Sequence, residues 1–313
     1  MKAAIFNAYG ATDVLDIADV PRPRCQVDEI LVRVRAAAVN PKDTFIRKGR
    51  FKRLSGENFP MLTGFDFAGE IAEIGSAVTG LTVGEPVYGM LDGFQGATCA
   101  EYLAVKPFRL AHKPENLSYG EAAALPLVTL TALQALRDVA RIQPGQHVCI
   151  NGASGGVGVM AVQIAKRYGA TVTAIGSQRN HDFLHGLGAD HCLDYREQDI
   201  TQSKERFDIF FDVFGNQPFR AIKPILTQRG VWVSTVIKSH VFRSVAFTKL
   251  FGRKKAKMVA VKANHDDLSL VREWVEASAL KSIIHAVYPL DQIRAAHAQQ
   301  ETKHTQGKIV VQI

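Results

Sequence analysis

Cysteines are scarce in this sequence, and those present lie far apart. The chain has four among 313 residues, Cys25, Cys99, Cys149 and Cys192, and no Cys-x-x-Cys pair. Disulfide frameworks and cysteine zinc lobes both depend on closely spaced cysteines, so the sequence indicates neither. We expect four reduced thiols in or near the core.

Long apolar runs are also missing. No stretch approaches the ~18–20 apolar residues that a membrane-spanning helix needs. The start, MKAAIFNAYG, lacks the apolar region and cleavage site of a secretory signal, so we expect a cytoplasmic protein with no membrane segment. A composition of 47% hydrophobic and 22% charged residues is typical of globular proteins, and this length allows one large domain or two.

Acidic residues are outnumbered, which gives a formal net charge of +8. Such a charge favours anionic partners, nucleotide phosphates among them. The densest basic run, KLFGRKKAK at Lys249–Lys257, is interpreted as a solvated loop, because short charge runs are common on surfaces. Contact with RNA or a membrane is the less favoured alternative, since no RNA-binding or helix-turn-helix motif accompanies the run.

The chain changes texture twice. Residues 1–117 are β-rich: DEILVRVRAAAVN has the alternation of a half-buried strand, and closely spaced glycines from Gly64 to Gly89 indicate the tight turns of a barrel-like fold. Residues 118–257 open with the capping-box pattern of Ser118 and Glu121 and then alternate strands with helices, which predicts a parallel sheet. Residues 258–313 are expected to return to the first domain.

A glycine-rich turn, NGASGGVG, follows the predicted strand HVCIN and opens a predicted helix. The three glycine positions of the dinucleotide-binding template fall on Ala153, Gly155 and Gly158. Gly155 would let the backbone approach a pyrophosphate, and Gly158 would allow close packing of helix and strand. A purely structural strand-to-helix turn is the competing interpretation, which the strand–turn–helix context disfavours.

The end of the next strand predicts which dinucleotide is bound. A site for NAD usually places Asp or Glu there to hold the ribose hydroxyls. No carboxylate occurs between Gly156 and His181, and Ser177 and Arg179 stand at this point instead. A hydroxyl and a guanidinium both suit a 2′-phosphate, so the sequence predicts NADPH. The alternative interpretation is that Arg179 is simply exposed to solvent and contacts no phosphate.

Several segments together resemble the zinc-independent quinone oxidoreductase branch of the medium-chain dehydrogenase/reductase superfamily, over essentially the whole chain. They are NPKDTFIRKGRF, FPMLTGFDFAGEIAEIGSAVTGLTVGEPVYG, LPLVTLTALQAL, ASGGVG, LGADHCLDY and GKIVVQI. The resemblance implies an α/β protein: a GroES-like β-rich catalytic domain interrupted by a doubly wound Rossmann domain, with a cofactor cleft between the two. It also implies a homodimer, and it places Tyr195 near the 2′-phosphate.

Zinc-dependent relatives in this superfamily use a Cys-x-x-Asp segment and a Gly-His-Glu segment. The corresponding positions here hold Asn40 and Phe65, which cannot replace a thiolate and an imidazole as ligands. His181 and His185 have i,i+4 spacing on a predicted helix, but two ligands are too few for a metal, so we interpret them as surface histidines. We therefore expect no metal.

Without a metal, an electron-poor acceptor is the easier substrate. We expect an oxidoreductase that transfers hydride from NADPH to a quinone or an α,β-unsaturated carbonyl. The runner-up is a metal-free alcohol or aldehyde reductase. An alternative from a different functional class is an NADPH-sensing or RNA-binding protein with little turnover.

By resemblance, the catalytic candidates are Asn40, Lys42, Asp43, Phe45 and Phe51. Asn40 would bond substrate or cofactor, Asp43 a ribose or its own loop, and Lys42 the developing negative charge, although a surface lysine is equally compatible with the sequence. Some relatives carry tyrosines at the two phenylalanine positions, so we expect solvent or a cofactor hydroxyl to supply the proton.

The glycine turn, the strand end and the resemblance also predict a set of cofactor contacts. Thr131 is assigned to the nicotinamide, with helix packing as the alternative. The full set is Thr131, Ser154, Gly155, Gly156, Val157, Gly158, Ser177, Arg179 and Tyr195.

Overall fold

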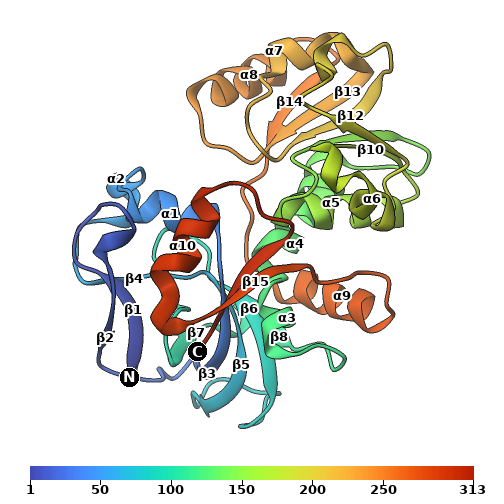
Figure 1. Cartoon of the computed structure of the whole chain (residues 1–313). Helices are drawn as coiled ribbons and strands as arrows, with labels where there is room; N and C mark the ends of the chain where they lie inside the picture. Colours follow the sequence, from blue (N-terminus) through green and yellow to red (C-terminus); the bar gives the residue numbers. More distant parts are fainter. The chain divides into compact units, whose positions relative to one another are not determined.

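A computed structural model describes all 313 residues, and the chain divides into two compact units (Figure 1). The first unit combines residues Met1–Leu130 with Lys262–Ile313, and the second unit is the intervening segment Thr131–Val261. These limits differ from the boundaries at residues 118 and 258 that we placed from sequence texture.

Packing explains both differences. Helix α3 (Tyr119–Ala123) begins with the expected capping box, but its buried alanines pack against β3 (Ile30–Val39) and β5 (Asp66–Ile74) of the first unit. At the other end, β14 (Lys255–Met258) pairs with β13 (Leu226–Ser234) and closes the sheet of the second unit.

The first unit is built on two sheets. The smaller has the order β2-β1-β4, and the larger has the order β15-β16-β3-β5-β6-β8, with β7 also paired to β3. Its further strands are β1 (Lys2–Phe6), β2 (Leu15–Asp19), β4 (Met61–Leu62), β6 (Pro86–Met90), β7 (Tyr102–Val105), β8 (Leu110–His112), β15 (Ile284–Pro289) and β16 (Lys308–Gln312). Its further helices are α1 (Pro41–Arg47), α2 (Lys52–Ser55), α9 (His265–Glu276) and α10 (Ile293–Glu301), and α4 (Pro126–Leu133) crosses into the second unit.

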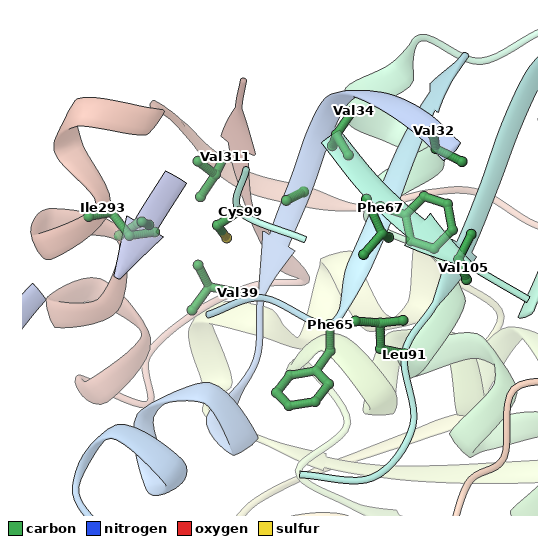
Figure 2. Close-up of a cluster of buried hydrophobic side chains, with 14 of the residues drawn as sticks. Val32, Val34, Val39, Phe65, Phe67, Leu91, Cys99, Val105, Ile293 and Val311 are labelled. Atoms are coloured by element: carbon green, nitrogen blue, oxygen red, sulfur yellow. The ribbon is translucent and has the colours of Figure 1, made fainter. Parts of the chain in front are cut away.

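The core of the first unit joins residues from both ends of the chain (Figure 2). Val39 on β3 and Phe67 on β5 pack in the same cluster as Ile293 on α10 and Val311 on β16, and all four are at most 1% exposed. Burying an aliphatic or aromatic side chain of this size contributes about 1.5–3 kcal/mol. The C-terminal strand and helix are therefore an integral part of the first unit.

The second unit contains a six-stranded, fully parallel sheet in the order β11-β10-β9-β12-β13-β14. Its remaining strands are β9 (His147–Asn151), β10 (Thr171–Gly176), β11 (His191–Asp194) and β12 (Phe207–Asp212). The α-helices are α5 (Gly156–Arg167), α6 (His181–Gly186), α7 (Phe219–Ile222) and α8 (Ser239–Leu250). This is the strand order of a Rossmann sheet, whose topological switch point lies between β9 and β12.

The basic run Lys249–Lys257 is not the continuous loop that we expected. Its first two residues end α8, and Lys255–Lys257 belong to β14. The ammonium groups of Lys254, Lys255 and Lys257 donate hydrogen bonds to backbone carbonyls of the second unit, so only part of the run is free in solvent. No helix of the structure is both long enough and apolar enough to cross a bilayer.

Candidate functional site

Three neighbouring strands of the first unit bring three buried polar side chains together at one end of the sheet. β16 begins with Lys308, Asn40 follows β3, and Asp66 begins β5. The Lys308 Nζ atom lies 2.5 Å from Asn40 Oδ1 and 3.2 Å from Asp66 Oδ2, and Asn40 Nδ2 donates to the same carboxylate at 2.8 Å. All three side chains are at most 4% exposed. A buried cation thus fills the space between the amide and the carboxylate.

Asp43 organises the loop that enters α1. Pro41 occupies the first position of that helix, and the Asp43 carboxylate accepts from the backbone N–H of Asn40 at 2.8 Å and of Gly64 at 2.8 Å. Thr63 donates its hydroxyl to the same carboxylate. Burial raises the pKa of Asp43, while these donors oppose that rise. Of the two roles expected for Asp43, this geometry fits the loop-organising one.

Lys42 projects among aromatic rings. Its ammonium lies 3.9 Å from the ring centroid of Phe65 and 5.5 Å from that of Phe94, and it makes no ion pair or hydrogen bond within the chain. Burial lowers the pKa of Lys42. Cation–π contacts hold the group in place without consuming its N–H donors. The half-buried Lys42 is therefore a cation free to donate to an anionic or carbonyl oxygen.

Phe45 and Phe51 extend this aromatic surface. Phe51 lies 5.2 Å from Phe94 and 6.4 Å from Phe45, measured between ring centroids, and both predicted rings are half-buried. The five catalytic candidates thus separate into two sets. Lys42, Phe45 and Phe51 present accessible side chains, whereas Asn40 and Asp43 are buried and bonded within the chain.

The sequence analysis did not single out Lys308, Asp66 or Phe94. Lys308 stands in GKIVVQI, and a charged residue at the head of an otherwise apolar strand was the available signal. Its partner Asp66 lies 242 residues away, so only the pairing of β3 with β5 and β16 makes the contact visible.

The glycine turn of the second unit lies between β9 and α5. Gly152 has a φ of +85°, so the left-handed conformation of the turn belongs to Gly152. The template had placed the first glycine of the turn one position later, at Ala153. A Cβ on Gly158 would lie 2.2 Å from the Gly152 carbonyl oxygen, so α5 can approach the turn only with glycine there. A Cβ on Gly155 would meet only one atom, at 3.6 Å.

The N-terminus of α5 is open to a ligand. Gly155 caps the helix and supplies no side-chain acceptor to its first amides, and residues 154–157 are all partly exposed. The free N–H groups and the helix dipole of this 12-residue helix favour an anion at that point. The backbone N–H groups of Ser154, Gly156 and Val157 have no partner within the chain, whereas the N–H of Gly155 donates to the Gly152 carbonyl oxygen at 3.3 Å. No side chain crowds the turn.

The end of β10 gathers the residues expected at the adenosine. β10 and β11 pair in parallel with Gly176 opposite Asp194, so Ser177 and Tyr195 both follow the same edge of the sheet. Arg179 is exposed and Tyr195 is 52% exposed, whereas Ser177 is buried.

Asp194 adds a carboxylate that the sequence analysis did not place at this edge. It accepts from the backbone N–H of Gln178 at 2.8 Å and of Arg196 at 2.8 Å, and these bonds lower the pKa of Asp194. Its oxygens are therefore already engaged by backbone donors.

The switch point between β9 and β12 carries a second buried polar group. Asn151 Nδ2 donates to Asp212 Oδ1 at 2.7 Å, and the Asp212 carboxylate also accepts from the backbone N–H of Gly215 and Gln217. Burial raises the pKa of Asp212. The Asp212 carboxylate therefore fixes the shape of the loop after β12.

Thr131, the remaining predicted cofactor contact, lies on α4 and is 6% exposed.

No group of three or more His, Cys, Asp or Glu side chains is arranged to hold a metal ion. Phe65 stands beside Asp66 and is buried, and Asn40 is bound to Lys308. His181 and His185 both lie on α6, as the sequence predicted.

Comparison with known proteins decides the family. The family model described as "Alcohol dehydrogenase GroES-like domain" matches residues 26–115, and that described as "Zinc-binding dehydrogenase" matches residues 187–311. The "Quinone-oxidoreductase homolog, chloroplastic" of Spinacia oleracea is 32% identical over 323 residues, covering 100% of this chain and 98% of that protein. The chain belongs to the quinone-oxidoreductase-like branch of the medium-chain dehydrogenase/reductase superfamily.

Two further relatives agree with this membership. The "NADPH-dependent alkenal/one oxidoreductase, chloroplastic" of Arabidopsis thaliana is 32% identical, over 99% of this chain and 79% of that protein. The solved quinone oxidoreductase from Coxiella burnetii has a TM-score of 0.93 at 33% identity, over 100% of this chain and 99% of that one. This member of the branch is therefore an oxidoreductase, with the GroES-like and Rossmann folds that its sequence predicted.

Proposed function

We propose that the protein is an NADPH-dependent oxidoreductase that reduces quinones or α,β-unsaturated carbonyls without a metal ion. The observation that carries the proposal is the Lys308 ammonium between Asn40 and Asp66. A divalent cation at Asn40 would have to displace a buried cation, and neither the amide nor Phe65 offers it a thiolate or an imidazole. An activated acceptor needs no such Lewis acid, because it takes hydride directly.

The second unit fits the cofactor. The open amides at the start of α5 would hold the pyrophosphate, and Ser177, Arg179 and Tyr195 would hold the 2′-phosphate. Asp194 stands at the same edge, but its acceptor oxygens are bound by two backbone N–H groups. NADPH, when bound, supplies the hydride.

The first unit fits the acceptor. The rings of Phe45, Phe51 and Phe94 form an apolar surface suited to a planar, electron-poor substrate. Lys42 would donate a hydrogen bond to the oxygen on which negative charge develops, and solvent would complete the protonation. Asn40 and Asp43 act as positioning residues, because their side chains hold the turn that carries Lys42.

The experiment is rapid-mixing oxidation of NADPH, followed by absorbance, with a panel of quinones, enones, simple aldehydes and ketones. We expect turnover with quinones or enones that survives a chelator, and little with simple carbonyls. Reduction of none of these acceptors, or activity that depends on added zinc, would overturn the proposal. The same proposal includes a homodimer, which light scattering on the purified protein tests. It also includes a cytoplasmic location, which fractionation of the native cell tests.

Lys42 has its own test, with an exposed lysine of α2 as the matched control. Lys42→Met should lower kcat/KM by about 10²-fold, whereas Lys52→Met should not change it. Because burial lowers the pKa of Lys42, activity should decline as pH rises through that lowered pKa, and Lys42→Arg should remove the decline. Full activity of Lys42→Met would refute this role and leave the reaction itself standing.

A further inference from the structure

The positive charge of this protein comes from one segment of the second unit. The 49 residues Val213–Val261 contain ten of the chain's 38 Lys and Arg and no Asp or Glu. The remaining residues carry 28 Lys and Arg against all 30 Asp and Glu, a net charge of −2. The net charge of +8 is therefore a local property of this segment, which favours anionic partners.

The same segment exposes apolar side chains. Phe242, Phe247, Leu250 and Phe251 are 49%, 59%, 77% and 59% exposed, on α8 and at its C-terminal end. The opposite side of the helix buries Val241 and Thr248 against the sheet, so the exposed residues face away from it. Phe247 and Phe251 lie 5.4 Å apart between ring centroids. One side of α8 is thus buried against the sheet, and the other side exposes apolar residues that nothing in the chain covers.

Three cations accompany that face and are free of partners. Arg243, Lys249 and Arg253 are exposed, and none makes a hydrogen bond or ion pair within the chain. By contrast, Lys254 and Lys255 are bound to backbone carbonyls. We name Arg243, Lys249 and Arg253, together with the four exposed apolar residues, the α8 surface.

We propose that the α8 surface docks on an anionic lipid bilayer, with α8 in the plane of the headgroups. A helix whose exposed side mixes Phe and Leu with Lys and Arg combines the two interactions that peripheral binding needs. The apolar side chains enter the headgroup boundary, and the basic ones meet anionic lipid, to which juxtamembrane cations are attracted. This association is peripheral, since no helix of the chain spans a membrane. It does not depend on the proposed reaction.

Charge and side-chain type favour lipid over the two other occupants. A second copy docked about a twofold axis would bring two copies of the same cationic surface together, and like charges brought close are unfavourable. Nucleic acid would satisfy the charges, but single strands stack on aromatic rings, and Leu250, the most exposed apolar residue of the surface, gains nothing from stacking.

The experiment is co-sedimentation of the full chain with vesicles of phosphatidylcholine alone or with 30% phosphatidylglycerol (about one lipid in three). We expect binding to the anionic vesicles only, and a loss of about tenfold or more in apparent affinity when the salt concentration is raised from 50 to about 500 mM.

Two variants separate the contributions. Phe247→Ser with Leu250→Ser should lower binding to anionic vesicles by about tenfold or more, and their matched control is Phe108→Ser, a residue that is 50% exposed in the first unit. The charge variant Arg243→Gln, Lys249→Gln and Arg253→Gln should remove the salt-dependent part. Circular dichroism checks that each variant remains folded.

Three results would overturn the proposal. The first is no binding of the wild-type chain to either vesicle, and the second is equal binding by the Phe247→Ser/Leu250→Ser variant. The third is a more favourable occupant: an RNA oligonucleotide bound more tightly than the anionic vesicles, or a dimer that the apolar variant converts to monomer in analytical ultracentrifugation.

Discussion

The buried pair of Lys308 and Asp66 makes a quantitative prediction. Lys308 is 4% exposed and Asp66 is fully buried, and the Lys308 ammonium also donates to the backbone oxygen of Val39 at 3.0 Å. Lys308→Met removes the cation and leaves the carboxylate with only two donors, Asn40 Nδ2 and the Leu127 N–H. Removing one partner of a buried pair costs about 3–5 kcal/mol, because an uncompensated charge remains.

The double variant sharpens the prediction. Asp66→Asn alone should be similarly destabilising, because it leaves a buried ammonium without its counter-charge. Lys308→Met combined with Asp66→Asn removes both charges, so its cost should fall short of the sum of the single variants by about 2–3 kcal/mol. A simple sum would show that the two groups do not interact in the folded chain.

The assay is urea unfolding followed by tryptophan fluorescence. The chain has two tryptophans, Trp232 in the second unit and Trp274 in the first, so a Trp232→Phe background reports on the first unit alone. The exposed pair of Lys106 and Asp28, 2.6 Å apart, supplies the control. Lys106→Met should leave the midpoint of unfolding unchanged, since an exposed ion pair contributes little. An unchanged midpoint for Lys308→Met would refute the buried pair.

Other outcomes follow from the cofactor unit and from α10. Arg179→Ala should lower the preference for NADPH over NADH by about tenfold or more in kcat/KM, while Arg229→Ala, on an exposed stretch of β13, should not; an unchanged ratio would exclude the 2′-phosphate contact. Gly158→Ala should lower both the melting temperature and cofactor affinity, because the new Cβ clashes with backbone, whereas Gly155→Ala should weaken cofactor binding in equilibrium titration with the melting temperature kept; equal melting losses would contradict the geometry. His297 is fully buried without a hydrogen-bond partner for either ring nitrogen, and burial lowers the pKa of His297 to about 3. The unfolded chain therefore binds the proton first, so stability is lost as pH falls from about 6.5 towards 3, and at pH 5 the loss is about 2 kcal/mol. His297→Leu should remove this part of the acid dependence, and identical acid unfolding curves would disprove it.

Much of the fold follows from local patterns. The alternation in ILVRVRAAAV predicted the strand that became β3, and the capping box at Ser118 and Glu121 predicted the start of α3. Strand–turn–helix alternation after β9 predicted the parallel sheet of the second unit. These features depend on residues two to four positions apart, so a linear sequence records them directly.

The limits of the units did not follow from local patterns. The alanines of α3 suit a helix in either unit, and only their packing on β3 and β5 assigns them to the first. The basic run was similarly ambiguous, because charge density does not distinguish a loop from the end of α8 and the edge strand β14.

The candidate site shows the same division. The turn before α5 and the absence of a carboxylate after β10 could be identified from the sequence, because each lies within one strand–helix–strand unit. The template nevertheless placed the turn residue at Ala153, whereas the left-handed conformation belongs to Gly152. Lys42, Phe45 and Phe51 were named by resemblance, and the structure adds that Lys42 rests on the faces of Phe65 and Phe94.

The sequence by itself predicted the β-rich first part, the alternating strands and helices that follow it, the glycine-rich turn and the resemblance to the family. Only the tertiary structure showed that Asn40 is bonded to Lys308 and Asp66, and that the Asp194 carboxylate accepts hydrogen bonds from backbone N–H groups. It also showed that α8 exposes apolar side chains to solvent. The physical reason is distance along the chain. Contacts between residues separated by tens to hundreds of positions depend on strand pairing and burial, and neither is written in any single stretch of sequence.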